Sequence, residues 1–348
     1  MTNWPAVPLL AAVSDKTSGN PKTPQSEYLR TGRYPVVDQG KNLIAGFTND
    51  PGLLHGESGP VIVFGDHTRC FKYVDFPFCM GADGVKVLKP QAGWDPKFLY
   101  YYLASLPIPS AGYSRHFKFL KEQVVAQPPL EEQRRIAEVL DRADELRAKR
   151  HQALANLDDL PQSIFLEMFD EPATNRRGME LRTLGELAKL KSGSFLPASR
   201  MVKNGQHAVL GGNGISGYHD EYMFEEAKLV VGRVGAYCGC IHMSPPQSWV
   251  TDNALYVSEL DPSVTITYLA HALKRASLNQ YASQSGQPLI SGSRVYPTPV
   301  LVPPIPLQRQ FADRVNAVEM LKAKNQTSLA ELDSLFASLQ DRAFRGLL

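Results

Sequence analysis

Residues 128–169 read PPLEEQRRIAEVLDRADELRAKRHQALANLDDLPQSIFLEMF, and residues 303–344 read PPIPLQRQFADRVNAVEMLKAKNQTSLAELDSLFASLQDRAF. The two stretches align without a gap at a constant offset of 175 residues. Their identities run along the whole length and are Pro128/Pro303, Pro129/Pro304, Gln133/Gln308, Arg134/Arg309, Ala137/Ala312, Leu146/Leu321, Ala148/Ala323, Lys149/Lys324, Leu154/Leu329, Ala155/Ala330, Leu157/Leu332, Asp158/Asp333, Leu160/Leu335, Ser163/Ser338 and Phe169/Phe344. An ungapped match of this length indicates an internal duplication.

Each copy predicts one long helix. Both open with a Pro-Pro pair, which disfavours helix upstream, and then run without glycine for more than thirty residues. At about 1.5 Å per residue each helix would be a rod of roughly 55 Å. Apolar positions three and four apart predict a coiled-coil seam. The predicted seam comprises Ile136, Val139, Ala143, Leu146, Arg150, Ala153, Leu157, Leu160 and Ile164 in the first copy, and Phe311, Arg314, Val318, Leu321, Asn325, Ser328, Leu332, Leu335 and Leu339 in the second.

Two polar residues and one proline interrupt these apolar patterns. Arg150 and Asn325 fall at the same repeat position, midway along each seam, so an antiparallel pairing would bring them near one another. We predict that they fix the register of the helix pair, the alternative being a solvent-exposed crossing. Pro161 stands inside the first helix where the second copy has Phe336, which predicts a kink or a restart near residues 158–159.

Two globular segments remain outside the helices. Turn formers and charges at residues 170–178 predict a linker. The expected organisation is a first domain over residues 1–127, a central helix over 128–170, a linker with a second domain over 171–302, and a C-terminal helix over 303–348. The segments share landmarks in order, which are residues 16–19 and 190–193, 35–37 and 207–210, 61–65 and 228–232, and 98–103 and 268–273. The β-branched runs among them read as strands and the last pair as a helix, so each segment is predicted to be a mixed α/β domain within an α+β fold.

Composition narrows the class of protein. The apolar share of 43% is that of a globular protein, and 37 Lys+Arg nearly cancel 35 Asp+Glu, so DNA binding would depend on local patches. Four cysteines without CxxC spacing fit a reducing cytosol. The start of the chain, Met1-Thr2-Asn3-Trp4-Pro5, lacks a signal-peptide pattern, and no stretch has eighteen successive apolar residues. We therefore expect a cytoplasmic protein without a membrane segment.

With its divergent domains and repeated helices, the chain resembles the specificity subunit of type I restriction-modification systems over its whole length. The motifs that carry the resemblance are Pro128-Pro129-Leu130-Glu131-Glu132-Gln133 and Pro303-Pro304-Ile305-Pro306-Leu307-Gln308 at the helix starts, the tails Leu160-Pro161-Gln162-Ser163-Ile164-Phe165 and Arg342-Ala343-Phe344-Arg345-Gly346, and Phe64-Gly65-Asp66-His67-Thr68-Arg69 with Trp249-Val250-Thr251-Asp252-Asn253 in the domains.

The resemblance implies two target recognition domains that each read half of a split site in double-stranded DNA, spaced by an antiparallel helix pair. It also implies two docked adenine-N6 methyltransferase subunits and, in a system that restricts, translocating nuclease subunits. The chain itself would be non-catalytic and without a cofactor, and S-adenosylmethionine would belong to the methyltransferase. The alternatives are a specificity subunit of a type II-like or methylation-only system and a coiled-coil scaffold that binds proteins.

Sequence motifs for an enzyme are incomplete. Residues 212–217 match GxGxxG, but the helix that should follow is missing, so a loop near a DNA backbone is favoured over a dinucleotide site. Residues 244–247, Ser-Pro-Pro-Gln, lack the aromatic of an amino-methyltransferase loop, and residues 226–228 read as an exposed turn. Cys238, Cys240 and His242 would share one strand face, yet a metal needs a fourth ligand, so no metal site is predicted.

Cationic and amide side chains near glycine-rich loops are the candidates for DNA contact, because Arg and Lys hold phosphates and read guanine while Asn and Gln read adenine. In the first domain these are Gln39, Lys41, Asn42, His67, Arg69, Arg115 and Lys118, and in the second Lys203, Asn213, Arg233, Ser293 and Arg294.

Overall fold

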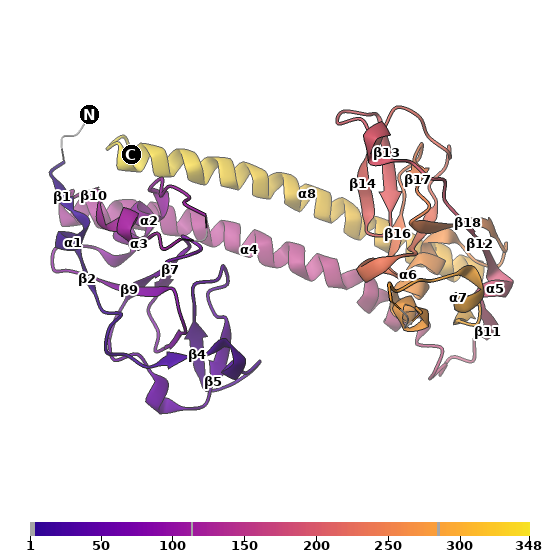
Figure 1. Cartoon of the computed structure of the whole chain (residues 1–348), viewed down its shortest axis with the longest axis horizontal. Coiled ribbons are helices and arrows are strands. Elements are labelled where there is room, and N and C mark those ends of the chain that lie inside the picture. Colours follow the sequence, from indigo (N-terminus) through magenta and orange to yellow (C-terminus); the bar gives the residue numbers. More distant parts are fainter. Residues whose placement is uncertain (1–3, 113, 284–285) are drawn as a thin grey trace. The chain divides into compact units, whose positions relative to one another are not determined.

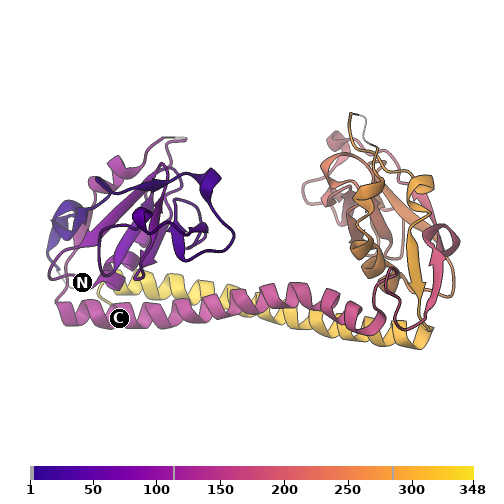
Figure 2. The same cartoon turned by 90° about the horizontal axis from the view of Figure 1, so that it is seen from below.

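The computed structural model describes residues 4–112, 114–283 and 286–348, so Met1, Thr2 and Asn3 of the N-terminal stretch lie outside it. The chain divides into two compact units. Unit 1 comprises Met1–His151 and Thr327–Leu348, and unit 2 comprises Gln152–Gln326. Each unit contains a globular domain and parts of both long helices (Figures 1 and 2).

The two long helices predicted from the repeat are present. Helix α4 spans Leu130–Phe169 and helix α8 spans Ile305–Phe344. Helix α4 continues through Pro161, whose side chain is buried, so the predicted restart near residues 158–159 is wrong. A proline removes a single helical hydrogen bond, and packing of the neighbouring turns outweighs that loss here. Helix α4 ends at Phe169, and Asp170, which follows it, takes the left-handed conformation with φ of 69°.

A buried glutamine fixes the start of each long helix to its own domain. In unit 1 the Gln133 carboxamide oxygen accepts from the Asp95 backbone N–H at 2.8 Å, and its nitrogen donates to the carbonyls of Gly93 and Pro128 at 3.1 and 2.9 Å. In unit 2 the Gln308 oxygen accepts from the Thr265 N–H at 2.7 Å. Its nitrogen donates to the carbonyls of Ser263 and Pro303 at 2.8 and 2.7 Å. Asp95 and Thr265 are the N-caps of the domain helices α2, Pro96–Ser105, and α6, Ile266–Ala276.

The helix segments run antiparallel within each unit. In unit 1 Arg135 donates to the Leu348 carbonyl at 2.9 Å, whereas Arg147, farther along α4, contacts Asp333 at 2.7 Å. In unit 2 Asp158 pairs with Lys322 at 2.8 Å. Farther along α4, the Phe165 ring lies 5.5 Å from that of Phe311.

The seam differs from the predicted one at five positions whose side chains are exposed, which are Leu146, Leu160, Arg314, Leu321 and Leu335. Leu146 and its repeat partner Leu321 are 53% and 50% exposed, and Leu335 is also 50% exposed. The other predicted positions are buried or half-buried. Buried or half-buried side chains that the prediction did not include lie at the same spacing and are Leu140, Arg147, Leu154, Pro161, Phe165 and Met168 in α4, and Val315, Lys322, Leu329, Phe336 and Ala343 in α8. Both spacings satisfy a heptad, and Arg147 enters the seam because its guanidinium stacks 4.5 Å from the Phe336 ring centroid.

The domain of unit 1 contains two four-stranded sheets, ordered β2-β9-β6-β7 and β3-β8-β4-β5. A short antiparallel pair, β1 and β10, joins the domain to the start of α4. Its elements are β1 Ala6–Pro8, α1 Leu9–Ala12, β2 Val13–Asp15, β3 Lys22–Thr23, η1 Gln25–Glu27, β4 Tyr34–Val37, β5 Gly46–Thr48, η2 Pro51–Leu53, β6 Val61–Gly65, β7 Phe71–Val74, β8 Cys79–Gly81, β9 Val85–Pro90, α2, α3 Phe117–Lys121 and β10 Val124–Ala126.

The domain of unit 2 repeats this plan with a sheet ordered β12-β18-β15-β16 and a three-stranded sheet β14-β13-β17, and the β11 and β19 pair replaces β1 and β10. Its elements are β11 Glu180–Thr183, α5 Leu184–Leu187, β12 Ala188–Ser192, η3 Ala198–Arg200, β13 His207–Gly211, β14 Gly214–His219, β15 Leu229–Gly232, η4 Gly235–Tyr237, β16 Ile241–Met243, β17 Trp249–Val250, β18 Ala254–Leu260, α6, η5 Leu278–Tyr281, α7 Gly292–Val295 and β19 Pro299–Val302. The predicted α+β class and the internal repeat are thus confirmed.

Each domain shares its main hydrophobic core with its own helix segments. In unit 1 Ile62, Phe98 and Leu120 pack in one cluster with Ile136 and Ala343. In unit 2 Val231, Tyr268 and Ile290 pack with Phe165 and Phe311 in the same way. Because burial of this apolar surface drives folding, the helix segments form part of each domain's core. Figure 2 shows the globular part of each unit lying along one side of its own helix segments.

Candidate nucleic-acid interface

The loop that follows β6 gathers most of the candidates of the first domain. Asp66 is buried, and its backbone oxygen accepts from the His116 N–H at 2.8 Å while its carboxylate accepts from the Phe117 N–H at 2.7 Å. The Gln39 carboxamide accepts from the His67 N–H at 3.2 Å. Two segments distant in sequence, at residue 39 and at residues 116–117, are therefore tied to this loop.

Arg69, Arg115 and Lys118 lie around this loop with exposed side chains. Arg69 takes the left-handed conformation with φ of 62°, and its guanidinium donates to the Ile108 carbonyl at 3.0 Å. Arg115 and Lys118 flank the buried His116. The structure thus brings Gln39, His67, Arg69, Arg115 and Lys118 into one neighbourhood.

Lys41 and Asn42 lie on the loop that also carries Gln39, and both are exposed. Lys41, however, lines a separate hollow of about 330 Å³ together with Lys72, Tyr73 and Asp141. Lys72 is directed inward, where its ammonium contacts the Asp38 carboxylate at 3.4 Å. Lys41 and Asn42 are therefore at the edge of the cluster around residues 66–69.

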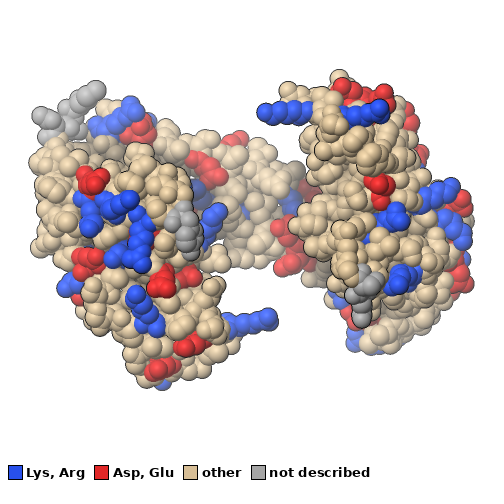
Figure 3. Space-filling model, in the orientation of Figure 1, with Lys and Arg blue, Asp and Glu red and all other residues tan. Residues whose placement is uncertain are grey.

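Two lysines that the sequence analysis missed add charge beside this cluster. The Lys86 and Lys121 ammonium groups lie 4.9 and 5.5 Å from the Phe117 ring centroid, and that of Lys118 lies 4.8 Å from the Phe119 ring centroid. Figure 3 shows Lys and Arg side chains gathered on this face of unit 1, over the part where α3 lies in Figure 1. The i,i+3 spacing of Lys118 and Lys121 is a sequence signal for the second lysine, whereas Lys86 reaches the patch only through the fold.

In the second domain, Asn213 and Arg233 lie on neighbouring loops. Residues 212–213 form the turn of the β13–β14 hairpin, so the GxGxxG match is a hairpin and not a dinucleotide loop. A Cβ on Gly232 would lie 2.5 Å from the Gly212 carbonyl oxygen, so the two backbones approach closely only without side chains there. The Arg233 guanidinium is half-buried and donates to the Ser192 hydroxyl at 3.0 Å.

The remaining candidates of the second domain are divided between its two ends. The Arg233 carbonyl accepts from the Ile290 N–H at 2.9 Å, which places the segment that carries Ser293 and Arg294 beside Arg233. Ser293 and Arg294 are exposed. Lys203 precedes β13 at the opposite end of the hairpin from Asn213 and does not join this group.

A hollow of about 720 Å³ next to Asn213 is lined by apolar side chains that the sequence analysis missed. Phe195, Ile215 and Tyr237 at its rim are 71%, 54% and 50% exposed. Exposed aromatic and aliphatic side chains beside an amide suit a surface that contacts base edges or thymine methyl groups.

The motifs weighed for catalysis have structural roles. The Ser244 hydroxyl accepts from the Lys228 N–H at 2.9 Å and bonds to the Ser248 hydroxyl at 2.9 Å, which holds the turn at residues 244–248. Only His242 of the cysteine and histidine group lies in a strand, and Cys238 donates to the Arg233 carbonyl. Within the described ranges, no three His, Cys, Asp or Glu side chains are grouped to hold a metal. All four cysteines are free thiols.

The predicted register residues lie in different units. Arg150 in unit 1 and Asn325 in unit 2 are each half-buried at a seam position. The Asn325 amide donates to the Leu321 carbonyl at 2.7 Å. A role of this pair in fixing the register stays a prediction.

Among the residues that the structure describes, no helix has the length and apolar character needed to span a bilayer.

Comparison with known proteins agrees with this architecture. Residues 11–156 and 176–333 each match the family model of the type I restriction modification DNA specificity domain. The chain is 30% identical over 168 residues to the type I restriction enzyme EcoprrI specificity subunit of Escherichia coli, covering 43% of this chain and 42% of that protein. It is 34% identical over 84 residues to the EcoR124I/EcoR124II specificity subunit of the same organism, covering 23% and 21%.

The chain thus aligns with less than half the length of these two relatives. Among solved structures, the S subunit of a type I system from M. genitalium superposes with a TM-score of 0.64 at 18% identity, covering 98% of this chain and 96% of that one. A structure described as the basis of complex assembly and conformational transition of a type I restriction-modification system gives 0.57 at 18% identity, covering 100% and 99%. These two likenesses are of fold. The two matched segments together span most of the chain, which therefore belongs to the type I restriction-modification DNA specificity domain family.

Proposed function

We propose that this chain is the non-catalytic DNA-recognition subunit of a type I restriction-modification complex. Its two domains would each bind one half of a split, asymmetric site in double-stranded DNA. The observation that carries the proposal is that two equivalent units share the glutamine junction between domain and helix, yet present different side chains on equivalent loops. Residues 66–69 follow β6 in unit 1, and residues 233–235 follow β15 in unit 2.

The chemistry of these loops supports DNA as the ligand. Arg69, Arg115 and Lys118 can hold phosphates, because a guanidinium or ammonium group replaces the counterions released from the duplex. Asn213 and Gln39 carry the carboxamide that pairs with adenine in the major groove. Because the net charge of the chain is only +2, electrostatic attraction to DNA would come from local patches of Lys and Arg, such as the one on the α3 face of unit 1.

The helices support docking of two identical partners. Leu146 and Leu321 occupy the same repeat position on α4 and α8, and both are half exposed although apolar. Arg134 and Arg309 are likewise equivalent and exposed. A surface that occurs twice suits two copies of one protein, and we propose adenine-N6 methyltransferase subunits, which would carry S-adenosylmethionine. In a system that restricts, translocating nuclease subunits would complete the complex.

The test is to co-express the chain with the methyltransferase encoded beside it and to map methylated adenines by long-read sequencing. We expect a split motif with an unread spacer, and no methylation when either protein is expressed alone. Exchanging residues 1–127 for the equivalent domain of a relative should change one half of the motif. A change in both halves, or methylation by the chain alone, would contradict the proposal.

A further inference from the structure

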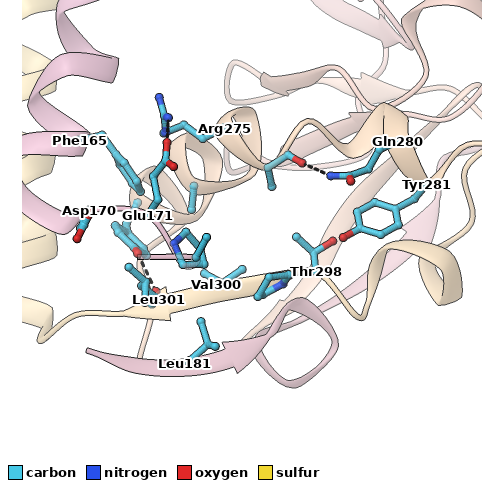
Figure 4. A pocket seen from close by; sticks show the side chains of 16 residues that line it. Phe165, Asp170, Glu171, Leu181, Arg275, Gln280, Tyr281, Thr298, Val300 and Leu301 are labelled. Atoms are coloured by element: carbon cyan, nitrogen blue, oxygen red, sulfur yellow. Dashed lines mark hydrogen bonds and ion pairs between the residues drawn. The ribbon is translucent and has the colours of Figure 1, made fainter. Parts of the chain in front are cut away.

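Unit 2 contains a cavity of about 450 Å³ between the end of α4, helix α6 and strand β19. The rings of Phe165 and Tyr268, the small Ala272 and Ala276, and Val300 line its apolar part. Figure 4 shows Arg275 with Glu171 on one side of the cavity and Tyr281 with Thr298 on the other. The Arg275 guanidinium is paired with the Glu171 carboxylate.

The cavity exists because α6 carries two alanines where α2 of unit 1 and its C-cap carry large side chains. Asp95 and Thr265 are equivalent, since each is an N-cap whose N–H bonds to the helix glutamine. Counting from these caps places Tyr102 at the position of Ala272 and Leu106 at that of Ala276.

In unit 1 the Tyr102 ring occupies the position that corresponds to the cavity. The Tyr102 ring lies 4.9 Å from that of Phe344 in an edge-on arrangement, and both rings are partly buried and pack against the core of that unit. Phe344 is the repeat partner of Phe169, which lies 4.9 Å from the Tyr268 ring. One copy of the duplication therefore shows which group completes this site, and the other copy lacks that group.

A buried hydroxyl gives the cavity a polar contact. Thr298 is 1% exposed and lines the cavity, and its hydroxyl has no hydrogen-bond partner among the described residues. Its counterpart in unit 1, Gln123, donates to the Phe119 carbonyl at 3.0 Å. Because a buried polar group without a partner is costly, a ligand that carries a hydroxyl would gain affinity at Thr298.

We infer that this cavity binds a tyrosine side chain presented by a protein partner. The aromatic ring follows from Tyr102 at the equivalent place, and the phenol follows from the Thr298 hydroxyl. A protein source follows from the surface around the opening. Leu181 and Pro299 both line the cavity and are exposed, Leu181 by 51%, so apolar surface continues outward for a segment larger than one ring.

The partner's identity rests on the proposed function, and we assign the tyrosine to a methyltransferase subunit. The repeated surface around Leu146 and Leu321 would accept two copies of that subunit. The cavity lies in unit 2, and Tyr102 stands at the corresponding position of unit 1. The two copies would therefore be bound with unequal strength, the tighter one at unit 2.

The first experiment measures binding of p-cresol, the side-chain analogue of tyrosine, to the full chain by ligand-observed NMR. We expect p-cresol to bind, and toluene, which lacks the hydroxyl, to bind about tenfold more weakly, the effect of one hydrogen bond. Thr298→Val should remove the difference between the two ligands, and Ala272→Tyr should abolish binding. If Ala272→Tyr does not fold, Ala276→Leu, which introduces the side chain of Leu106, replaces it. Absence of p-cresol binding to the wild-type chain, or unchanged binding in the filled variant, would overturn the inference.

The second experiment measures retention of the co-expressed methyltransferase. We expect Ala272→Tyr to weaken one of two bound copies by at least about tenfold, whereas the matched control Ala272→Ser, which keeps the cavity open, retains both. Equal retention by the two variants would overturn the assignment to a protein side chain, even if p-cresol binds. Failure of the wild-type chain to bind any methyltransferase would instead contradict the proposed function and this choice of partner, while the p-cresol result would still decide the chemistry of the cavity.

Discussion

Gln133 and Gln308 make the same set of three hydrogen bonds in the two units. Each carboxamide oxygen accepts from the N-cap of a domain helix, at 2.8 Å from Asp95 and 2.7 Å from Thr265. Each amide nitrogen donates to one carbonyl before that cap and to one in the Pro-Pro turn. Both side chains are fully buried, so the domain and the long helix meet at a polar contact that excludes water.

Replacement of either glutamine should destabilise its unit. Gln133→Leu and Gln308→Leu each remove three hydrogen bonds to backbone groups, one of them fully buried, so we expect each to lower the free energy of unfolding by roughly 2 kcal/mol or more. Urea denaturation measures the effect. Arg134→Ala and Arg309→Ala, at the adjacent exposed positions, should change stability little. Equal effects at residues 133 and 134 would contradict the role of the carboxamide.

Replacement of the exposed leucines should affect partner binding and not folding. Leu146→Ser and Leu321→Ser alter half-exposed side chains, so we expect an almost unchanged melting temperature and weaker retention of the methyltransferase. Leu140→Ala, at a fully buried position, should instead cost about 2–5 kcal/mol of stability. A large loss of stability in Leu146→Ser would show that the seam includes this position after all.

Removal of a phosphate contact should weaken DNA binding without regard to sequence. For Lys118→Ala we expect weaker binding to specific and unrelated duplexes alike, with the slope of log K against log salt reduced by about one. Fluorescence anisotropy at several salt concentrations measures this slope. Lys149→Ala, at an exposed position on α4, is the matched charge control and should keep the wild-type slope.

Arginines of the two domains should act on different half-sites. Arg69→Ala changes the loop after β6 in unit 1, and Arg294→Ala changes helix α7 in unit 2. We expect each to relax selection at one half of the methylated motif, at a cost of about 1–3 kcal/mol per lost base contact. Methylation mapping with each variant separates the halves. Relaxation of the same half by both variants would refute separate reading.

The stability of unit 2 should fall as the pH falls below the ordinary pKa of histidine. Burial, with a smaller effect of the Lys274 charge, lowers the pKa of His271 from 6.5 to about 4. Between these two values His271 stays neutral in the folded state and takes up a proton in the unfolded state. The contribution of neutral His271 to the stability of unit 2 is therefore complete above pH 6.5 and is lost as the pH falls toward 4. The loss at the acid end of this window would be roughly 3 kcal/mol.

His271→Phe should remove this part of the pH dependence, since phenylalanine cannot take up a proton in either state. Urea unfolding at intervals between pH 7 and pH 4 compares the variant with the wild-type chain. His151→Gln, at an exposed position on α4, should follow the wild-type curve. A curve for His271→Phe that parallels the wild type would exclude His271 as the source.

The elements that the sequence predicted well are those with a local signal. The long helices follow from glycine-free periodicity after the Pro-Pro pairs, and β6, β15, α2 and α6 fall where the shared landmarks lie. The predicted seam was wrong at five exposed positions, because apolar spacing alone cannot distinguish Leu146 from Arg147. Arg147 lies in the seam because its guanidinium packs on the Phe336 ring, an interaction that a pattern of apolar residues does not predict.

The DNA-binding candidates were predicted by residue type, and the fold decides which of them meet. Arg115 and Lys118 approach His67 and Arg69 because Asp66 accepts from His116 and Phe117 at the start of α3, and Gln39 joins them because it accepts from His67. Spacing in the sequence does not predict contacts between segments so far apart. Lys203 does not lie with the other candidates of the second domain, because the β13–β14 hairpin separates it from Asn213. The sequence does not show in which direction that hairpin runs.

The buried glutamines also determine where natural or engineered recombination can join two such chains. The backbone groups that Gln133 contacts at residues 93, 95 and 128, and those that Gln308 contacts at residues 263, 265 and 303, keep their matched geometry when both sides of the junction come from one parent. A crossover between residues 95 and 128 would combine a cap from one parent with a glutamine from another. A crossover inside α4, beyond residue 133, transfers an intact junction together with its domain, so chimeric genes that retain function should have their breakpoints inside the helix.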